Sequence, residues 1–416
     1  MVRRVPTPRV TFVLLVALCL TALLPLVSQN WTVWGAAAAD PLREWLGNET
    51  VAWVEGVLFR VQDEVQQRQY ALSQQPPETP WELVLPTPTP SPTVTPTATR
   101  PRPTLTRPAS GSTPTPLPPT ATPHPTATAT PTPWQPAAAA ALGQLEGEGI
   151  WSPYLFGEDN QAVAYRTFFQ PDPERPFALV AVVAIDLSQT QLHFVLGSEE
   201  PSQPDGPRGR GQIPTEHKDT GILLATFNGG FKATHGQFGA MADGIEALPP
   251  QDGLATVALY DDGRIKIGAW GTDIVPDDHL IAWRQNAPLI IDKGEMTEAA
   301  RRNSMADWSG SVHDEIVTWR SGLGLSADGR ILYYFAGPSL HMPSLAQTML
   351  AVGVEQGMLL DINPSWVQFS AITAEAEELV ATPLLAEMPH PDRYLNRYGY
   401  ERDFFYLTVA NHPIGD

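Results

Sequence analysis

The segment Asn228-Gly229-Gly230-Phe231 places residues that can bind a ligand at the end of an apolar strand pattern. Residues 222–227 read Ile-Leu-Leu-Ala-Thr-Phe and predict a buried strand that stops at Asn228. Asn228 offers a hydrogen-bond donor and an acceptor, and two adjacent glycines permit positive φ and a close approach of backbone N–H groups to a ligand. A plain turn is the alternative, because such tripeptides are common in loops.

A carboxylate ends a second apolar run, Met358-Leu359-Leu360-Asp361. A helical pattern from about Pro343 to Gln356 precedes this run, and Gly357 suits the end of that helix. A carboxylate at a strand terminus is placed where α/β proteins commonly gather their chemistry. Asp361 is therefore a catalytic candidate, with a strand-end turn residue as the alternative.

Other charged side chains near these strands are candidates for anion binding or proton transfer. Arg320 precedes a strand, and its planar guanidinium can clamp a phosphate, whereas Lys232 follows the glycine turn directly. His217 and His235 flank the same strand and loop and are candidates for an acid, a base or a cation ligand. For each of them the alternative is an ordinary surface or loop residue.

The region from about 145 to 416 is large enough for one well-cored domain. Turn residues inside 254–270 and 321–335 predict two hairpins, and 178–187 and 191–197 read as paired strands. Together with the helix over 343–356, these elements predict an α+β fold in which a single domain mixes helices and strands.

The residues before this domain predict an anchor, a helix and a linker. Arginines precede an apolar run over 10–27, so 1–30 predicts a cytoplasmic tip with a transmembrane anchor; the alternative is a cleaved signal that would leave the protein secreted. An amphipathic helix is expected within 31–85, lying on the bilayer or, preferably, pairing with a partner helix. Residues 86–144 predict a disordered linker, whose Pro- and Thr-rich part over 86–136, of about fifty residues, reaches ~150 Å when fully extended.

Composition excludes several classes of partner. The formal net charge of -19 argues against nucleic acid and anionic membrane surfaces, which need clustered Lys and Arg. The only cysteine, Cys19, lies within the apolar run, so a disulfide framework and a cysteine-based zinc site are excluded. A metal ion would need oxygen or imidazole ligands.

In the order of its motifs, the chain resembles the phosphodiester glycosidases related to the enzyme that uncovers mannose 6-phosphate. The resemblance covers about 178–408 and rests on the glycine turn at 228–231, a glycine-rich segment around Gly239 and Gly244, and four later segments. Those segments are Asn286-Ala287-Pro288-Leu289-Ile290, Trp319-Arg320-Ser321-Gly322-Leu323-Gly324-Leu325, the turn Asp328-Gly329-Arg330, and the helix leading to Leu360-Asp361.

This resemblance implies hydrolysis of a sugar joined through its anomeric carbon to a phosphodiester, and the match falls on Asp361. For this chemistry we expect Asp361 as nucleophile, base or electrostatic stabiliser, with Asp243 or Glu216 as a second carboxylate; a solvated loop acid is the alternative for these two. The catalytic candidates are Asp361, Asn228, Arg320 and Asp243, and the substrate-binding candidates are Gly229, Gly230, Phe231, Lys232, His235, Asn363, Ser365 and Trp366. The metal requirement stays open, with Ca²⁺ or Mg²⁺ as the candidate cations.

The loop after Asp361 departs from the family. Relatives continue with a run of glycines and a serine, whereas this chain continues Ile362-Asn363-Pro364-Ser365-Trp366. Pro364 has no N–H to offer a phosphate, and Trp366 offers either a face for a sugar or ordinary core packing. Two functions are therefore expected as alternatives: a membrane-tethered extracytoplasmic hydrolase of bacterial cell-envelope glycosyl phosphodiesters, or a non-catalytic module that binds envelope glycan.

Overall fold

The computed structural model describes residues 48–73, 75–83, 134–157, 159–219, 221–304, 308, 317–375 and 378–410, with side chains from residue 59 onward. The predicted anchor at 10–27 and most of the predicted linker lie outside these residues. Among the helices that are described, none combines the length and the apolar composition needed to cross a bilayer.

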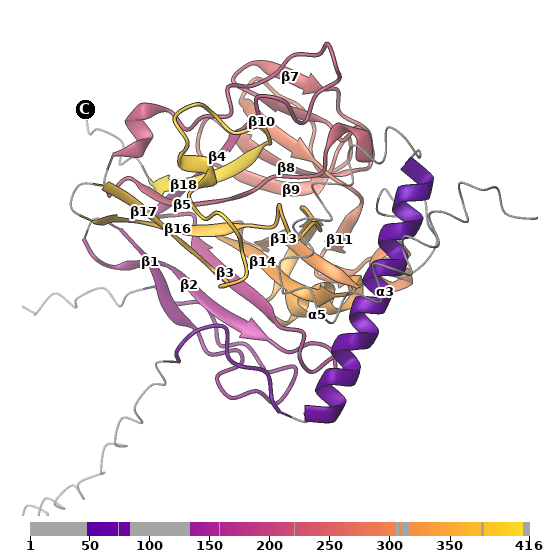
Figure 1. Ribbon diagram of the computed structural model, residues 1–416. Coiled ribbons are helices and arrows are strands. Elements are labelled where there is room, and N and C mark those ends of the chain that lie inside the picture. Colours follow the sequence, from indigo (N-terminus) through magenta and orange to yellow (C-terminus); the bar gives the residue numbers. More distant parts are fainter. Residues whose placement is uncertain are drawn as a thin grey trace, which may run out of the picture. The chain divides into compact units, whose positions relative to one another are not determined.

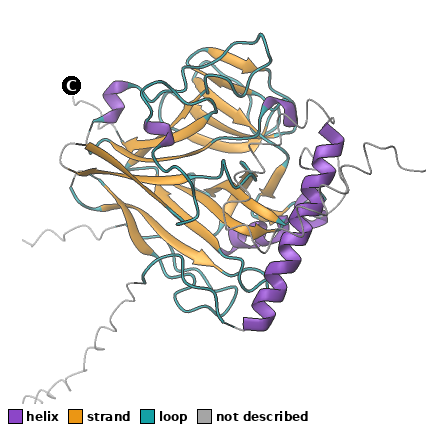
Figure 2. Cartoon of the chain, in the orientation of Figure 1, coloured by secondary structure: helices purple, strands orange, loops and turns teal. Residues whose placement is uncertain are grey.

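The fold is built mainly from β-strands (Figures 1 and 2). Strands account for 38% and helices for 14% of the structure, and every pair of neighbouring strands is antiparallel, so the predicted α+β class is wrong. The predicted helix over 343–356 is only the ten-residue α5 (Met342–Ala351), because Gly353 adopts a positive φ of 79° and the chain then continues as a strand from Val354.

Sheet A has eight strands in the order β1-β2-β3-β14-β13-β15-β11-β12 and forms the centre of the domain. Its strands are β1 (Ser152–Phe156), β2 (Ala162–Phe169), β3 (Val180–Asp186), β11 (Leu289–Asp292), β12 (Glu295–Met296), β13 (Thr318–Ser326), β14 (Ile331–Leu340) and β15 (Val354–Leu359). The predicted hairpin over 321–335 is confirmed as β13 and β14, in which Leu323 lies opposite Tyr334.

Two five-stranded sheets complete the domain. Sheet B, in the order β17-β16-β5-β18-β4, contains β4 (Thr190–Val195), β5 (Leu223–Asn228), β16 (Phe369–Glu375), β17 (Glu378–Pro383) and β18 (Phe404–Val409). Sheet C, in the order β7-β6-β10-β8-β9, contains β6 (Ala240–Ala242), β7 (Ile245–Leu248), β8 (Ala255–Tyr260), β9 (Ile265–Ala269) and β10 (Leu280–Gln285). The predicted hairpin over 254–270 is confirmed as β8 and β9.

The strands β3 and β4 exist as predicted but do not pair with each other. β3 pairs with β2 and β14 in sheet A, whereas β4 pairs only with β18 at the edge of sheet B. The chain passes from sheet A to sheet B at a turn in which the Asp186 carboxylate accepts hydrogen bonds from the backbone and the hydroxyl of Ser188.

Sheet A is covered on both faces, so its central strands read as continuous apolar runs. Adjacent residues of β3 belong to different hydrophobic clusters. Val183 packs in the cluster that contains Phe227 of sheet B, and Val182 packs in the cluster that contains Leu345 of α5. Helix α5 approaches sheet A closely because Gly322 and Gly357 have no side chain. A Cβ on Gly322 would lie 2.7 Å from Met349 Cε. The connections contain short helical turns: η2 (Thr215–Lys218), η3 (Ala233–His235), α4 (Glu298–Arg302) and η5 (Arg393–Leu395).

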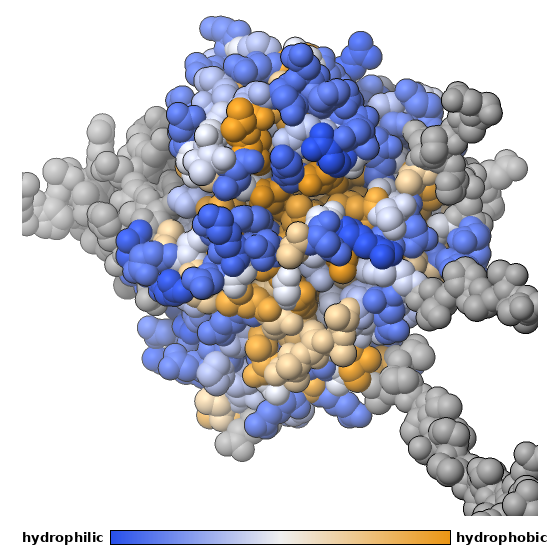
Figure 3. Space-filling view, turned by 180° about the vertical axis from the view of Figure 1, so that it is seen from behind, coloured by the Kyte–Doolittle hydropathy of each residue, from blue (hydrophilic) through white to orange (hydrophobic). Residues whose placement is uncertain are grey.

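Helix α3 (Asn48–Ser73) is the longest helix described, and it packs against the β domain. Asp63, Gln66 and Tyr70 contact Arg175, Ser339 and Phe177 respectively. Polar residues prevail on the face of the molecule in Figure 3, and apolar side chains gather in its middle.

Truncating a core aromatic residue should cost far more stability than truncating an edge one. Phe335 is fully buried on β14, whereas Phe156 on the edge strand β1 is 47% exposed. We expect Phe335→Ala to lower the free energy of unfolding by about 3–5 kcal/mol, because it leaves a cavity, and Phe156→Ala by under ~1 kcal/mol. Urea unfolding of the full chain measures both, and equal losses would contradict the assigned core.

Candidate functional site

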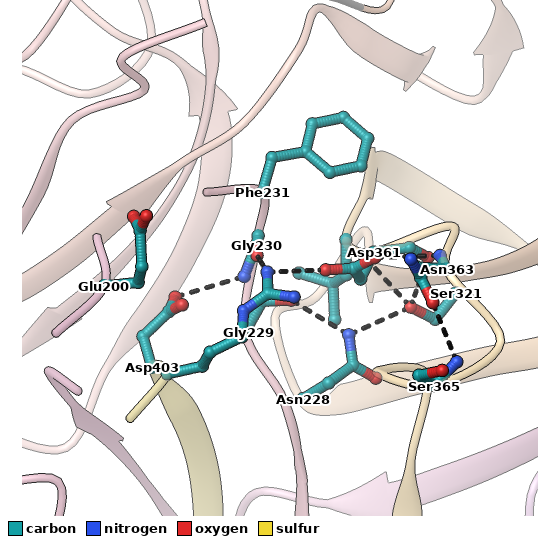
Figure 4. Close-up of polar contacts among 12 residues, drawn as sticks. Glu200, Asn228, Gly229, Gly230, Phe231, Ser321, Asp361, Asn363, Ser365 and Asp403 are labelled. Atoms are coloured by element: carbon teal, nitrogen blue, oxygen red, sulfur yellow. Dashed lines mark hydrogen bonds and ion pairs between the residues drawn. The ribbon is translucent and has the colours of Figure 1, made fainter. Parts of the chain in front are cut away.

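Two of the predicted strand ends, and a serine between them, meet at one point (Figure 4). Asn228 ends β5, Asp361 follows β15, and Ser321 lies on β13, the neighbour of β15. Ser321 Oγ donates to the backbone oxygen of Asp361 at 2.9 Å and accepts from Asn228 Nδ2 at 3.0 Å. The structure thus brings Asn228 and Asp361 together through one hydroxyl group.

Asn228 is buried, and its amide is fully used by the protein. Its Oδ1 accepts hydrogen bonds from Tyr334 OH and from the Gln368 backbone N–H, at 2.9 and 3.1 Å. Its Nδ2 donates to Ser321 Oγ and to the Gly229 backbone oxygen. Asn228 therefore ties sheets A and B together beneath the site and has no polar atom left for a substrate.

Asp361 is paired with Arg402, a residue that lies just before β18. Arg402 Nη2 donates to Asp361 Oδ2 at 2.7 Å and to the Gly230 backbone oxygen at 2.8 Å. Asp361 Oδ1 accepts the backbone N–H of Asn363 at 2.9 Å, so both carboxylate oxygens are engaged. On its other side, the Arg402 guanidinium lies 4.8 Å from the centre of the Trp366 ring, within the range of a cation–π interaction.

The charge of Arg402 is secured by its neighbours. Burial alone would lower the pKa of the guanidinium, but the carboxylates of Asp361 and Asp403 outweigh burial, and the pKa stands above its ordinary value. Burial likewise raises the pKa of the adjacent Tyr400, so its phenol stays neutral. The site therefore presents a permanent cation beside an indole ring.

The two glycines of the turn are required by a second buried ion pair. Asp403 Oδ2 accepts from Arg284 Nε at 2.8 Å and from the Gly230 backbone N–H at 3.1 Å. A Cβ on Gly229 would lie 2.2 Å from Asp403 Oδ2, and one on Gly230 would lie 2.9 Å from Arg284 Cζ. Neither glycine has a positive φ, and both N–H groups donate to Asp403, so close packing of charges explains them.

A small cavity of about 10 Å³ separates these ion pairs. Asn228, Asp361, Trp366, Arg402 and Asp403 are among its lining residues, and the volume is close to the room needed by one water molecule. Asp403 Oδ1 is buried there with no hydrogen-bond partner in the protein, so a water molecule would satisfy it. A sugar does not fit into this cavity.

The altered loop after Asp361 is closed by its own side chains. Asp361 Oδ1 accepts the N–H of Asn363, and Asn363 Oδ1 accepts the N–H of Ser365 at 2.8 Å. Pro364, between them, has no N–H. These backbone groups are unavailable to a phosphate, so an anion at this site must be bound by cationic side chains instead.

Such side chains line an open cleft of about 720 Å³ above Trp366 and Arg402. In a chain of net charge -19, four cationic residues gather there beside three glutamates. The cationic residues are Arg208, Lys232, Arg393 and Arg402, and the glutamates are Glu199, Glu200 and Glu401. Lys232 Nζ lies 5.8 Å from the centre of the Trp366 ring, and Ser365 also lines the cleft, so three predicted substrate-binding residues share it.

Arg320 lies apart from this cleft. Adjacent residues of a strand point to opposite faces of the sheet, and Ser321 faces Asp361, so Arg320 faces the α5 side. There its Nε donates to the Leu340 backbone oxygen, and burial lowers its pKa to about 10. We therefore leave Arg320 out of the proposed site.

Asp243 lines a different cleft, of about 460 Å³. His193 and Tyr406 line it too, with their rings stacked at 4.5 Å, and His217 Nδ1 lies 2.7 Å from Tyr406 OH. Glu216 belongs to η2, beside His217. These predicted candidates therefore gather away from Asp361.

Two predicted substrate-binding residues have other surroundings. Phe231 is 5% exposed and packs in the core at 6.1 Å from Phe238. His235 is half-buried in η3 and is not among the residues that line the described cleft. As for a metal, the described residues contain no group of three or more His, Cys, Asp or Glu side chains arranged to hold an ion.

The sequence reasoning missed Arg402, Asp403 and Arg284, although a signal was present. Glu401-Arg402-Asp403 directly precedes the apolar run Phe404-Phe405-Tyr406-Leu407, as a polar group at a strand end. Arg284 lies inside the apolar strand β10, where a charged side chain requires a buried partner.

Comparisons with known proteins give a distant likeness of fold. No protein-family model matches the chain, and neither does any curated protein. The catalytic domain of zebrafish N-acetylglucosamine-1-phosphodiester alpha-N-acetylglucosaminidase, auto-inhibited by its pro-peptide, is similar with a TM-score of 0.40 and 13% identity over 62% of this chain and 87% of that one. A hypothetical protein from Synechocystis is similar with a TM-score of 0.30 and 11% identity over 56% of this chain and 59% of that one.

His193 should make the stability of the domain depend on pH. Burial, aided by His217, lowers the pKa of His193 from 6.5 to about 3. Between these two pH values His193 is protonated in the unfolded chain but not in the folded chain. The free energy of unfolding therefore falls as the pH drops from about 6.5 towards 3, by up to ~1.4 kcal/mol per pH unit. His193→Phe keeps the stacked ring and should flatten this slope in urea unfolding between pH 4 and 7; parallel curves would contradict the assignment.

Proposed function

We propose that this chain is a glycosidase-type hydrolase that cleaves sugars joined to phosphodiesters, and that the cleft above Trp366 binds its substrate. The observation that carries the proposal is the guanidinium of Arg402, held between the Asp361 carboxylate and the Trp366 ring at the floor of the cleft. A fixed cation beside an aromatic face suits a ligand that combines a phosphate with a sugar ring.

The residues take distinct roles in this proposal. Arg402, with Lys232 and Arg393, binds the phosphodiester, and Trp366 supports the sugar. Asp361 orients Arg402, since both oxygens of this carboxylate are already bonded. Glu200 lines the cleft and is fixed by the Ala233 N–H at 2.8 Å, which makes it the carboxylate best placed to activate water or to stabilise positive charge on the sugar.

The chemistry asks little of a general acid. A phosphodiester is a good leaving group, so the site must mainly stabilise the oxocarbenium-like transition state and position a water molecule. A second carboxylate beside Glu200 is therefore dispensable. We further propose that the protein acts outside the cytoplasm on cell-envelope glycans, tethered to the membrane by residues 10–27 or secreted after cleavage.

One observation favours a second candidate function, binding of an envelope glycan without turnover. Asp361 is 3% exposed, and Arg402 blocks one of its oxygens. Catalysis by Asp361 as nucleophile or base, the role expected from the sequence, would require this ion pair to open, whereas binding of a phosphate by Arg402 leaves it intact. The binding function therefore needs no rearrangement.

Substitutions at the ion pair should separate a working site from a structural one. We expect Asp361→Asn and Arg402→Lys each to lower kcat/KM for a chromogenic sugar phosphodiester about 100-fold, because a misplaced cation stabilises the transition state poorly. Asp278→Asn, on an exposed loop, should leave turnover unchanged. Thermal unfolding confirms that each variant is folded, and wild-type turnover by a folded Asp361→Asn would overturn the role of Asp361.

Trp366 distinguishes hydrolysis from binding alone. If the wild-type chain hydrolyses the phosphodiester, Trp366→Ala should raise KM about tenfold with a smaller effect on kcat, because it removes a contact made in both ground and transition states. Assays with added Ca²⁺ or Mg²⁺ and with a chelator test the cation requirement. Wild-type binding of envelope glycan that Trp366→Ala abolishes, with no turnover under any of these conditions, would establish the second function.

A further inference from the structure

From residue 59 onward, helix α3 contacts the β domain through two polar side chains, Asp63 and Gln66, as well as through Tyr70. Arg175 Nε and Nη2 donate to the two carboxylate oxygens of Asp63 at 2.9 and 2.8 Å, and the paired side chains are only 15% and 10% exposed. Gln66 Oε1 accepts from Ser339 Oγ at 2.6 Å, one turn further along the helix. By contrast, Val65 and Leu72 of the same helix are 42% and 87% exposed.

The partner of Asp63 is held by a network within the domain. Arg175 Nη1 also pairs with Asp172 at 3.2 Å, and Asp172 is 3.3 Å from His341 Nε2. His341 Nδ1 accepts the Ser344 N–H at the start of α5, so the proton of a neutral His341 lies on Nε2 and points to Asp172. The surface that receives α3 is therefore preorganised by charges of the domain.

The segment that follows α3 is fixed to one face of β2. The Trp81 ring lies 4.4 Å from the guanidinium carbon of Arg166 and 5.8 Å from the ring of Phe168, edge-on. Leu83 packs against Gly147, where a Cβ would lie 2.3 Å from Leu83 Cδ1. Trp81 thereby joins the core cluster shared by sheets A and B.

The chain is fixed again at Trp134, on the other face of the same strand. Trp134 packs edge-on against Tyr165 at 5.4 Å and joins the cluster that contains α5. Trp151 Nε1 donates to the Ala137 backbone oxygen at 2.9 Å. Tyr165 and Arg166 are neighbours on β2, so the two tryptophans are attached on opposite sides of one strand.

We propose that residues 59–83 are an intramolecular clip, docked on the β domain of their own chain, which turns the Pro/Thr-rich residues 84–133 into a loop closed at both ends. The domain is then held to the N-terminal part of the chain through α3, and the reach of the Pro/Thr-rich segment does not set its distance from a membrane. Cutting this loop leaves the two pieces associated.

The test uses the full chain in detergent, with an affinity tag at its N-terminus and a site for a sequence-specific protease inserted between residues 100 and 110. After complete cleavage, we expect the C-terminal piece to stay on the affinity resin with the N-terminal piece. Asp63→Lys should increase the released fraction at least about tenfold, because it leaves Arg175 facing a like charge. Release of the C-terminal piece from the chain that has the tag and the protease site but no substitution would overturn the proposal.

Two controls make the result specific. Glu64→Lys alters the neighbouring acid, which is solvent-exposed and pairs with Arg68 of the same helix, and should retain the C-terminal piece. Exchanging the charges, Asp63→Arg with Arg175→Asp, should restore the retention that Asp63→Lys loses. Mixing tagged and untagged chains before cleavage tests whether α3 docks on its own chain or on another copy. Capture of C-terminal pieces from the untagged chains would show docking on another copy and would overturn the intramolecular assignment.

Discussion

The structure depends on two buried ion pairs that join its three sheets at one point. Arg284 of sheet C pairs with Asp403, which leads into sheet B, and Arg402 beside it pairs with Asp361 at the end of a strand of sheet A. Removing one partner from such a pair costs several kcal/mol, since an uncompensated charge is left in a medium that solvates it poorly. Four charges that neutralise one another therefore fix the relative positions of the sheets.

This constraint accounts for residues that otherwise look like ligand-binding motifs. Gly229 and Gly230 pass between the ion pairs, and any side chain there would collide with Asp403 or Arg284. Asn228 completes the junction by bonding to residues of sheets A and B. The motif is thus a structural support, and it fixes Arg402 beneath the Trp366 ring.

The strand pattern and the hairpins followed from local sequence, whereas pairing over long distances did not. Apolar runs and turn residues located β5, β8, β9, β13 and β14, but the path from β3 to β4 depends on which sheet accepts each strand. Asn228 and Asp361 were identifiable as polar strand ends. Arg320 was expected just before a strand, but β13 begins at Thr318, so Arg320 lies within the strand and on the face opposite Ser321. For α3, the amphipathic pattern suggested a bilayer or a partner helix, whereas the pairing of Asp63 with Arg175, which are far apart in the sequence, is not visible in any local pattern.

The closed loop after Asp361 limits how the proposed site could bind an anion. A glycine-rich loop holds phosphate oxygens with backbone N–H groups, whose positions are fixed and whose charge is partial. Here the N–H groups of Asn363 and Ser365 donate to side chains of the loop itself, and guanidinium and ammonium groups line the cleft instead. Recognition by full charges at an open cleft is stronger at low ionic strength and is screened by salt. In the function proposed above, selectivity would then rest on contact between the sugar ring and Trp366 more than on the shape of a backbone cradle, because Lys232 and Arg393 are long side chains that can reach a phosphate in several positions.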